Sequence, residues 1–435
     1  MPRNNRVRLI NMIRLDLENC VKLNTHLKND IIRFRVDEIS YNTFYREFIN
    51  QNWPAVITNI SSEWECSHTW ISRKNATRMN INFAYLKDKI KDCLVPVTNC
   101  IDKSVSIEVS FYDYIDKWEK SILSRNSGED SVHLYLKDWH LKAYLRNYEF
   151  YNVPKHFFSD WLNEFLTENH RDDYRFVYMG PKNTWTPFHV DVFGSFSWSA
   201  NVYGCKKWIL LPPGEELKLL DQYKKLPCEI NEETLRKSKI KYFVVYQKQN
   251  EGIFVPSGWY HQVTNITDTI SVNHNWFNAA NLKYIWNNIS SNLRKVVIEI
   301  NDFRRSHNFN EQCQQILHVD FGINIAEFLE ILCFIAKRRL FLLKKQGNSN
   351  IKNIQCPSSH MFYINDFHIY YDLKNIDTVL KTMIQDKFVH NCSRLYNKCI
   401  KFISLINQYT SLINKNIPYV LKTNMLKTIY SLTDI

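Results

Sequence analysis

The feature that most constrains the fold is a run of short, closely spaced strand patterns between positions 174 and 276. Apolar and polar side chains alternate within these segments, and Pro, Gly and Asn stand at their junctions. The pattern predicts strands at 175–179, 186–192, 197–203, 207–211, 242–247, 252–255, 260–265 and 269–276. Short antiparallel strands in this number favour a closed or double-sheet architecture, and we expect a jelly roll.

Helical patterns flank this core, so the predicted fold class is α+β. After position 281 apolar residues recur with helical spacing, at Leu282, Ile285, Trp286, Ile289 and Leu293. Residues 212–240 form a polar excursion between strands, which we expect to lie over the barrel mouth. The predicted units are an α/β lead-in that packs on the barrel (1–130), the barrel core (131–280), a helical lobe (281–346) and a basic helical extension (347–435).

The positive charge is concentrated near the end of the chain. Of the formal net charge of +12, the segment 331–435 supplies +10, because it holds fifteen Lys and Arg against five Asp and no Glu. A solvated helix face is the plainer interpretation. A weak contact of this basic tail with RNA or a ribosome is the alternative. We expect the chemistry to survive removal of residues 350–435.

The cysteine pattern indicates a reducing compartment. The chain has eleven cysteines at irregular spacing and no Cys-x-x-Cys pair, which favours free thiols. No segment approaches the apolar length of a membrane span, and residues 1–16 lack the apolar core of a signal peptide. We therefore expect a cytoplasmic protein, with the nucleus as second choice, and no membrane partner. A zinc cluster in the tail stays an alternative, although its spacing matches no known finger, with ligands Cys356, His360, His390, Cys392 and Cys399.

Three ligand-type residues suggest a metal centre in the barrel. His189 and Asp191 stand two residues apart on a predicted strand, so their side chains point to the same face. His261 lies on a later strand that can neighbour the first in a closed sheet. Two His and one carboxylate leave adjacent positions open on an octahedral Fe(II), where a cosubstrate and dioxygen can bind together. A structural zinc site with four protein ligands would leave no such room.

A lysine on the next predicted strand pair extends this site. A buried Lys206 ammonium needs an anionic partner, and the distal carboxylate of a metal-chelating dicarboxylate would supply one. The hydroxyl groups of Thr186 and Tyr135 could donate hydrogen bonds to that carboxylate, and so could the side-chain amide of Asn273. Lys207 competes for this role, but strand alternation points it to the opposite face.

These motifs resemble the JmjC-domain oxygenases over roughly residues 35–345. The stretches that carry the resemblance are Asp173–Pro181, Trp185–Asp191, Ser195–Trp198, Lys206–Trp208, Phe254–His261 and Ile270–Trp276, with further support from Tyr135–His140, Phe158–Glu164 and Gly322–Phe328. The resemblance implies a double-stranded β-helix with Fe(II) on His189, Asp191 and His261. It implies 2-oxoglutarate on Lys206, contacts from Thr186 and Tyr135, and Asn273 at a position where some relatives have Thr.

The implied activity is hydroxylation of a lysyl side chain on a protein, with O2 as oxidant and with release of succinate and CO2. Translation release factor 1 is the family's known substrate. The chain departs from the family pattern in two regions outside the metal and cosubstrate residues. It runs from Cys100 directly into Ile101, where relatives have a longer loop, and its tail beyond about 350 has no recognised counterpart.

Two alternatives compete with this assignment. An Nε-methyl-lysine demethylase would use the same metal chemistry on an N-methyl carbon, but the sequence contains no chromatin-reading zinc module. A non-catalytic adaptor would keep the barrel as a scaffold and bind RNA or a ribosome through its tail. A degenerate barrel usually loses a ligand, whereas His189, Asp191, Lys206 and His261 are all present, which favours an enzyme.

Overall fold

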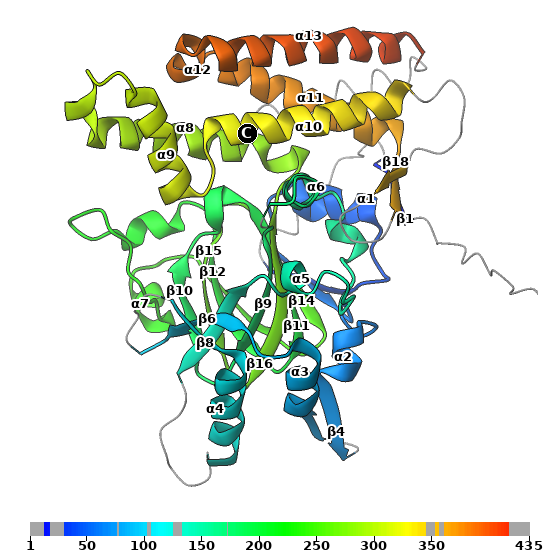
Figure 1. Ribbon diagram of the computed structural model, residues 1–435, viewed down its shortest axis with the longest axis vertical. Helices are drawn as coiled ribbons and strands as arrows, with labels where there is room; N and C mark the ends of the chain where they lie inside the picture. The colour runs from blue at the N-terminus through cyan, green and yellow to red at the C-terminus, as the bar shows by residue number, and fades with distance from the viewer. Residues whose placement is uncertain are drawn as a thin grey trace, which may run out of the picture.

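The structure is a computed structural model, and it describes residues 13–17, 30–75, 78–101, 106–124, 133–171, 173–344, 353–355 and 361–416. Figure 1 shows a β-sheet core in the lower part of the view and a layer of long helices across the top. This arrangement confirms the predicted α+β class with a jelly-roll core and a helical C-terminal region. No helix in the described ranges has the length and apolar content to span a membrane.

Two sheets form the core. The larger has nine strands in the order β2-β3-β14-β11-β16-β9-β8-β6-β7, and the smaller has the order β10-β15-β12-β13. Their bounds are β2 (Arg33–Arg35), β3 (Ala55–Thr58), β6 (Leu94–Asn99), β7 (Ile107–Ser110), β8 (Leu134–Trp139), β9 (Arg175–Gly180), β10 (Trp185–His189), β11 (Phe196–Tyr203), β12 (Lys206–Leu211), β13 (Phe243–Gln247), β14 (Glu251–Val255), β15 (Tyr260–Asn265) and β16 (Thr269–Trp276). The sheets pack face to face, because one apolar cluster joins Val56 and Ile253 of the larger sheet to Trp208 and Val263 of the smaller one.

Strand β10 ends earlier than the sequence suggested. The predicted strand 186–192 stops at His189, so Asp191 lies just beyond it in extended backbone. The register with β15 shifts between Thr186 and His189, across a proline that has no N–H to donate. The N–H of Phe188 instead donates to the Cys228 carbonyl, at 2.8 Å. Asp191 therefore reaches the site from the turn after the strand.

The polar excursion lies on the outer face of the smaller sheet. It contains η5 (Glu215–Leu219) and α7 (Glu232–Lys237). Its apolar side chains Ile230 and Leu235 cluster with Phe188 and Ile209. Phe188 and Ile209 point to the outer face of the sheet, because they alternate with residues that face the interior. The expectation that the excursion lies over the barrel mouth is therefore wrong for the part around Ile230 and Leu235. Burial of its apolar side chains against the sheet explains the difference.

Helices surround the core and build the upper layer. Their bounds are α1 (Tyr41–Phe44), η2 (Tyr45–Ile49), α2 (Glu65–Thr69), α3 (Phe83–Ile90), α4 (Phe111–Ser124), α5 (Leu141–Tyr144), η3 (Lys155–Phe157), α6 (Trp161–Glu168), η4 (Val192–Gly194), η6 (Ala279–Asn281), α8 (Leu282–Glu299), η7 (Asn301–Phe303), α9 (Phe309–Phe321), α10 (Ile325–Lys344), α11 (Asp366–Met383), α12 (Lys387–Asn391) and α13 (Ser393–Asn416). Helix α6 contacts both α10 and β16, which joins the layer to the barrel. The remaining short strands are β1 (Ile13–Leu15), β4 (Ile71–Asn75), β5 (Arg78–Ile81), β17 (Asn353–Gln355) and β18 (Met361–Ile364).

A buried ionic network ties α10 and α11 together. The Arg339 Nε donates to Asp372 Oδ2 at 2.6 Å, and both side chains are fully buried. His368 lies 3.2 Å from the same carboxylate and is hydrogen-bonded to the Tyr41 hydroxyl near the start of the chain. Burial alone raises the pKa of Asp372, but His368 and Arg339 outweigh it and hold that pKa below its usual value.

The extension beyond 347 is thus continuous with the rest of the fold. Helix α11 packs against α8, α10 and α13, and β18 pairs in parallel with β1. Its buried side chains Leu373, Ile376 and Leu380 belong to the main apolar core. Of the suggested zinc ligands, Cys356 and His360 lie outside the described residues, and Cys399 is a buried thiol whose pKa burial raises to about 11.

We expect Asp372→Asn to destabilise the fold by about 3–5 kcal/mol, because it removes the charge of the carboxylate that is hydrogen-bonded to the buried Arg339 guanidinium. Urea unfolding measures this loss. Glu233→Gln, which removes one partner of the exposed Lys237 pair, is the matched control and should change little. An Asp372→Asn protein as stable as the wild type would show that the tail does not support the core.

Candidate active site

The structure brings His189, Asp191 and His261 together at one point. One ligand atom of each lies within 4.8 Å of the others, and this is the group of metal-ligating residues found among the described residues. The β10–β15 register places His189 directly opposite His261, with ring centroids 4.3 Å apart. The two His side chains and the carboxylate thus form the predicted facial set, and they reach it from a strand end, the following turn and a second strand.

Both imidazoles present the same nitrogen to this point. Nδ1 of His189 lies 2.7 Å from the Pro187 carbonyl oxygen, and Nδ1 of His261 lies 2.9 Å from that of Trp259. A carbonyl only accepts, so Nδ1 carries the proton and Nε2 is left as the metal-binding atom. Burial, and then the proximity of His261, lower the pKa of His189 to about 4. At neutral pH this ring is therefore neutral, as a metal ligand must be.

Two side chains that the sequence reasoning missed hold Asp191. Ser197 Oγ donates to Asp191 Oδ2 at 2.7 Å, and Asn275 Nδ2 donates to Oδ1 at 2.9 Å. A signal for Asn275 exists in the sequence, because the polar residues Ser271, Asn273 and Asn275 recur at every second position of β16 and so line one face. Only Asn273 was predicted to contribute.

Helix α8 fixes the turns beside the metal ligands. Gly194 (φ +73°) follows Asp191, and Gly258 (φ +77°) precedes His261. A Cβ on Gly258 would come within 2.2 Å of the Tyr284 hydroxyl, and a Cβ on Gly194 within 2.6 Å of the Tyr284 ring. The start of α8 therefore packs directly on both turns and requires glycine at each.

Lys206 lies in a cradle that fits the end of a dicarboxylate. Its Nζ donates to the Tyr135 hydroxyl at 3.0 Å, and only 2% of the lysine is exposed. No carboxylate among the described residues pairs with it, and burial lowers its pKa to about 7. Asn265, opposite Lys206 on β15, has a buried side-chain oxygen without a hydrogen-bond partner. The Lys206 ammonium, which has no anionic partner among the described residues, and the Tyr135 hydroxyl are donors that fit the end of a dicarboxylate, whereas the Asn265 oxygen is an acceptor and would not contact that carboxylate.

The strand alternation predicted for the two lysines is confirmed. Lys207 points to the other face of β12, where its Nζ lies 2.6 Å from Glu232 Oε1. Thr186 stands opposite Val263, and Asn273 stands opposite Phe176, so both face the barrel interior with the metal ligands. The amide of Asn273 donates to Ser271 Oγ at 3.1 Å, and its partner in the structure is thus another strand residue.

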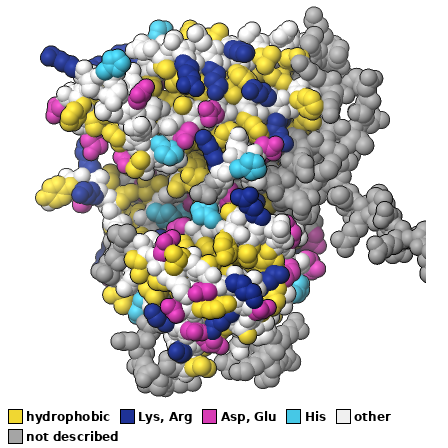
Figure 2. All heavy atoms as spheres, in the orientation of Figure 1, with side chains coloured by type: hydrophobic (Ala, Val, Ile, Leu, Met, Phe, Trp, Pro, Cys, Tyr) yellow, Lys and Arg dark blue, Asp and Glu magenta, His cyan; other side chains and the backbone are white. Residues whose placement is uncertain are grey.

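A further carboxylate, Asp138, lies beside this interior. It accepts from the Tyr178 hydroxyl, and the Tyr178 ring lies 5.9 Å from Tyr135 and 5.7 Å from Lys206 Nζ. Burial, Asp138, Tyr135 and Asp191 all raise the pKa of Tyr178. Asp138 itself is half-exposed and has positive φ (+58°) where the β8 register shifts. Figure 2 shows histidine side chains at a hollow between the helical layer and the barrel.

We expect 2-oxoglutarate to bind with uptake of a proton by Lys206. At pH 8 a lysine of pKa about 7 is mostly neutral, and a bound carboxylate restores its charge, so uptake is about 0.9 proton. Affinity for the cosubstrate therefore falls as pH rises above 7. Calorimetry on Mn(II)-loaded protein in buffers of different ionisation enthalpy measures this uptake. Lys206→Met should abolish it and Lys207→Ala should preserve it, whereas equal behaviour of the two variants would contradict the assignment.

Loss of the Asn275 amide should weaken metal binding about 10- to 100-fold, because Asp191 would lose one of the two donors that orient it. Titration of Asn275→Ala with Mn(II), followed by electron paramagnetic resonance, measures this change. Asn273→Ala, two residues away on the same strand, is the control and should keep the wild-type metal affinity. If Asn275→Ala binds Mn(II) as tightly as the wild type does, this amide does not position the ligand.

Comparison with known proteins agrees with this geometry. Residues 176–276 match the family model described as JmjC domain, hydroxylase. The chain is 43% identical to the 2-oxoglutarate and iron-dependent oxygenase JMJD4 homolog of Drosophila melanogaster, over 88% of this chain and 94% of the relative. It is 33% identical to Arginine-specific demethylase JMJ20 of Arabidopsis thaliana, over 82% and 79% of the two chains.

A more distant relative is Bifunctional arginine demethylase and lysyl-hydroxylase psr-1 of Caenorhabditis briggsae, at 27% identity over 60% of this chain and 65% of the relative. The resemblance to JmjC-domain oxygenases is confirmed, and the match to the Drosophila protein, which covers nearly the whole of both chains, narrows it to the relatives named JMJD4. The cofactors that the motifs implied, Fe(II) and 2-oxoglutarate, agree with the names of these relatives and with the His-Asp-His group. The chain therefore belongs to the JMJD4 family of JmjC-domain, 2-oxoglutarate- and iron-dependent oxygenases.

Proposed function

We propose that this oxygenase hydroxylates a lysyl side chain of a protein, and that translation release factor 1 is a substrate. The observation that carries the proposal is the Asp138 carboxylate beside the candidate iron and cosubstrate site, where a cationic side chain could bind. The name of the psr-1 relative includes lysyl-hydroxylase activity, which supports the same class of substrate.

In this proposal the barrel residues have separate tasks. His189, Asp191 and His261 would bind Fe(II) through the two Nε2 atoms and a carboxylate oxygen. Lys206 and Tyr135 would bind the distal carboxylate of 2-oxoglutarate, and Thr186 and Asn273 would face the same interior from the smaller and the larger sheet. When bound, the iron and 2-oxoglutarate supply an oxidant from O2 that inserts one oxygen atom into a C–H bond, while 2-oxoglutarate becomes succinate and CO2.

Asp138 would orient the substrate side chain. Its carboxylate accepts from Tyr178, whose ring borders the Lys206 and Tyr135 cradle, so a cation bound at Asp138 would lie next to the cosubstrate. Lys137 Nζ lies 3.8 Å from the other oxygen of this carboxylate, and its positive charge also lowers the pKa of His189. A positive side chain entering between these residues would pair with Asp138 and hold its methylene carbons toward the metal.

Demethylation of a cationic side chain is the second candidate. The JMJ20 and psr-1 relatives both carry arginine demethylase in their names, and an N-methyl carbon could occupy the place of a lysyl methylene. The same Asp138 carboxylate would serve a methylated arginine or lysine. The two activities differ in product, because demethylation releases formaldehyde and hydroxylation leaves oxygen on the side chain.

We expect purified release factor 1, incubated with the enzyme, Fe(II), 2-oxoglutarate and O2, to gain one oxygen atom on a lysine, detected by mass spectrometry of its peptides. His189→Ala should abolish the gain. Asp138→Asn should raise KM for the protein substrate about tenfold and leave kcat largely unchanged, since Asn tolerates the same left-handed backbone but lacks the charge.

Asp113→Asn, at an exposed carboxylate on α4, is the control for Asp138→Asn and should match the wild type. Loss of methyl groups with release of formaldehyde, in place of lysine oxidation, would favour the demethylase. An unmodified release factor 1 would reject it as the substrate.

A further inference from the structure

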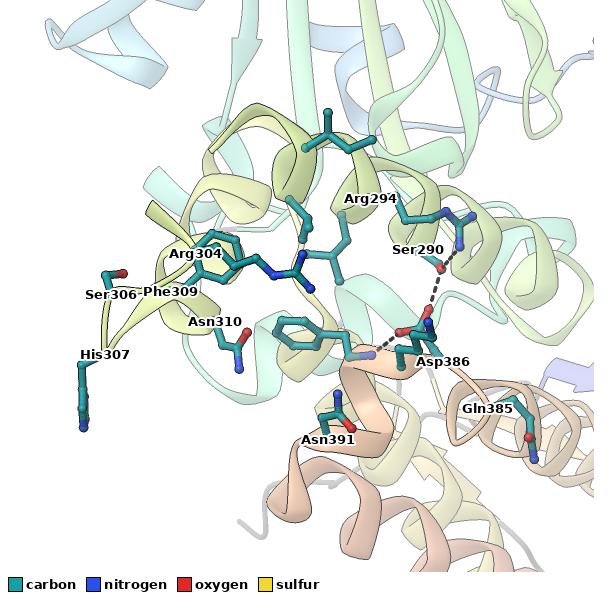
Figure 3. A pocket seen from close by; sticks show the side chains of 15 residues that line it. Ser290, Arg294, Arg304, Ser306, His307, Phe309, Asn310, Gln385, Asp386 and Asn391 are labelled. Carbon is teal, nitrogen blue, oxygen red and sulfur yellow. Dashed lines mark hydrogen bonds between the residues drawn. The ribbon is translucent and has the colours of Figure 1, made fainter. Parts of the chain in front are cut away.

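A hollow in the helical layer lies apart from the residues assigned to iron and 2-oxoglutarate. Its volume is about 720 Å³, and its walls are α8, the segment from η7 to α9, and the α11–α12 junction (Figure 3). The last of these walls belongs to the basic extension, for which the proposed reaction has no role. Helix α8 connects the two regions, because its first turns pack on the turns beside the metal ligands and its last turns line the hollow.

Part of the inner surface of the hollow is apolar. Leu293 and Val297 come from α8, Phe309 from α9 and Phe388 from α12. At the rim Ile298 is 75% exposed, and the neighbouring Phe303 is 64% exposed. A hollow of this volume with aliphatic and aromatic walls suits one or two bulky apolar side chains of a ligand. Exposed apolar residues gathered at such a rim are typical of binding surfaces.

The charges around the hollow are positive. Arg294, Arg304 and Lys387 line it, and Figure 3 shows the Arg304 side chain extending over its interior. Within the described ranges, no carboxylate lies at ion-pair distance from these three side chains. Asp386 is the one acidic residue of the lining. The hollow therefore has a positive rim around an apolar interior.

Asp386 offsets one of these three positive charges, and both of its oxygens already accept hydrogen bonds within the fold. Oδ1 accepts the Phe388 N–H at 2.9 Å and caps α12. Oδ2 accepts from the Ser290 hydroxyl at 2.9 Å, and Arg294 donates to the same hydroxyl at 3.0 Å. These bonds hold the tail wall against α8, as the dashed lines in Figure 3 show, and they leave Arg304 and Lys387 for a ligand.

We propose that this hollow is a docking site for an acidic segment of a partner protein, in which bulky apolar side chains are flanked by Asp and Glu. The apolar side chains would enter between Leu293 and Phe388, and the flanking carboxylates would pair with Arg304 and Lys387. Charge complementarity selects an acidic partner. The aliphatic side chains Leu293 and Val297 beside the two Phe rings favour the branched and aromatic side chains of a peptide over RNA, whose bases stack on aromatic rings alone.

The test uses the full-length protein and a fluorescein-labelled peptide in which a Leu-Phe pair is flanked on both sides by Asp and Glu. Fluorescence anisotropy should show saturable binding. The double variant Arg304→Glu/Lys387→Glu should weaken binding by tenfold or more. Lys283→Glu/Lys295→Glu reverses two exposed charges on α8 outside the lining and should bind like the wild type. Thermal melting establishes that both variants are folded.

A second peptide, with Ser-Ser in place of Leu-Phe, separates docking from general attraction between opposite charges, and it should not bind measurably. The proposal is overturned if the wild type does not bind the first peptide, if the two double variants weaken binding equally, or if both peptides bind alike. Displacement of the peptide by single-stranded RNA, with the same loss in Arg304→Glu/Lys387→Glu, would also overturn it and assign the hollow to nucleic acid. Because the readout is binding, the result does not depend on whether the chain hydroxylates lysine.

Discussion

The pairing of β10 with β15 determines where everything else at the site can lie. It places His189 against His261, residues separated by 72 positions of sequence, and the register shift around Pro187 lets the chain turn so that Asp191 meets them. On the other side of β15, β12 sets Lys206 opposite Asn265, four residues from His261. One central strand thus fixes the spacing between the metal ligands and the cation that would bind the far end of the cosubstrate.

The two ends of the site differ in how fully their charged side chains are paired within the protein. Lys206 is enclosed with a single hydroxyl partner, so its charged form is costly until an anion arrives. The carboxylate of Asp191, by contrast, already has two donors, and both imidazoles are fixed through Nδ1. The metal end of the site is therefore preorganised, whereas the cosubstrate end is completed only by its ligand. The cosubstrate end therefore favours a ligand with an anionic group that can reach Lys206.

The sequence predicted those parts of the site that depend on local alternation. Strand phase distinguished Lys206 from Lys207, and the His-x-Asp spacing with a later His predicted the His-Asp-His group that the structure brings together. The end of β10 and the direction of Asp138 depend on register shifts, which alternation does not record. The tail joins the core through the pairing of Arg339 with Asp372, which is a tertiary contact. Composition alone showed only an excess of positive charge in this part of the chain. The sequence shows Ser197 and Asn275 as polar strand positions, but it does not show that both donate to Asp191.

The most direct measurement is an anaerobic titration of the purified protein with Fe(II) in the presence of 2-oxoglutarate, followed by visible absorption. Chelation of Fe(II) by 2-oxoglutarate at a site with open adjacent positions produces a metal-to-ligand charge-transfer band. We expect a band that saturates at one iron per chain, disappears in His189→Ala and requires much more 2-oxoglutarate in Lys206→Ala, while Lys207→Ala resembles the wild type. Absence of the band in the wild type, or an unchanged band in His189→Ala, would contradict the assignment of the barrel as an iron and 2-oxoglutarate site.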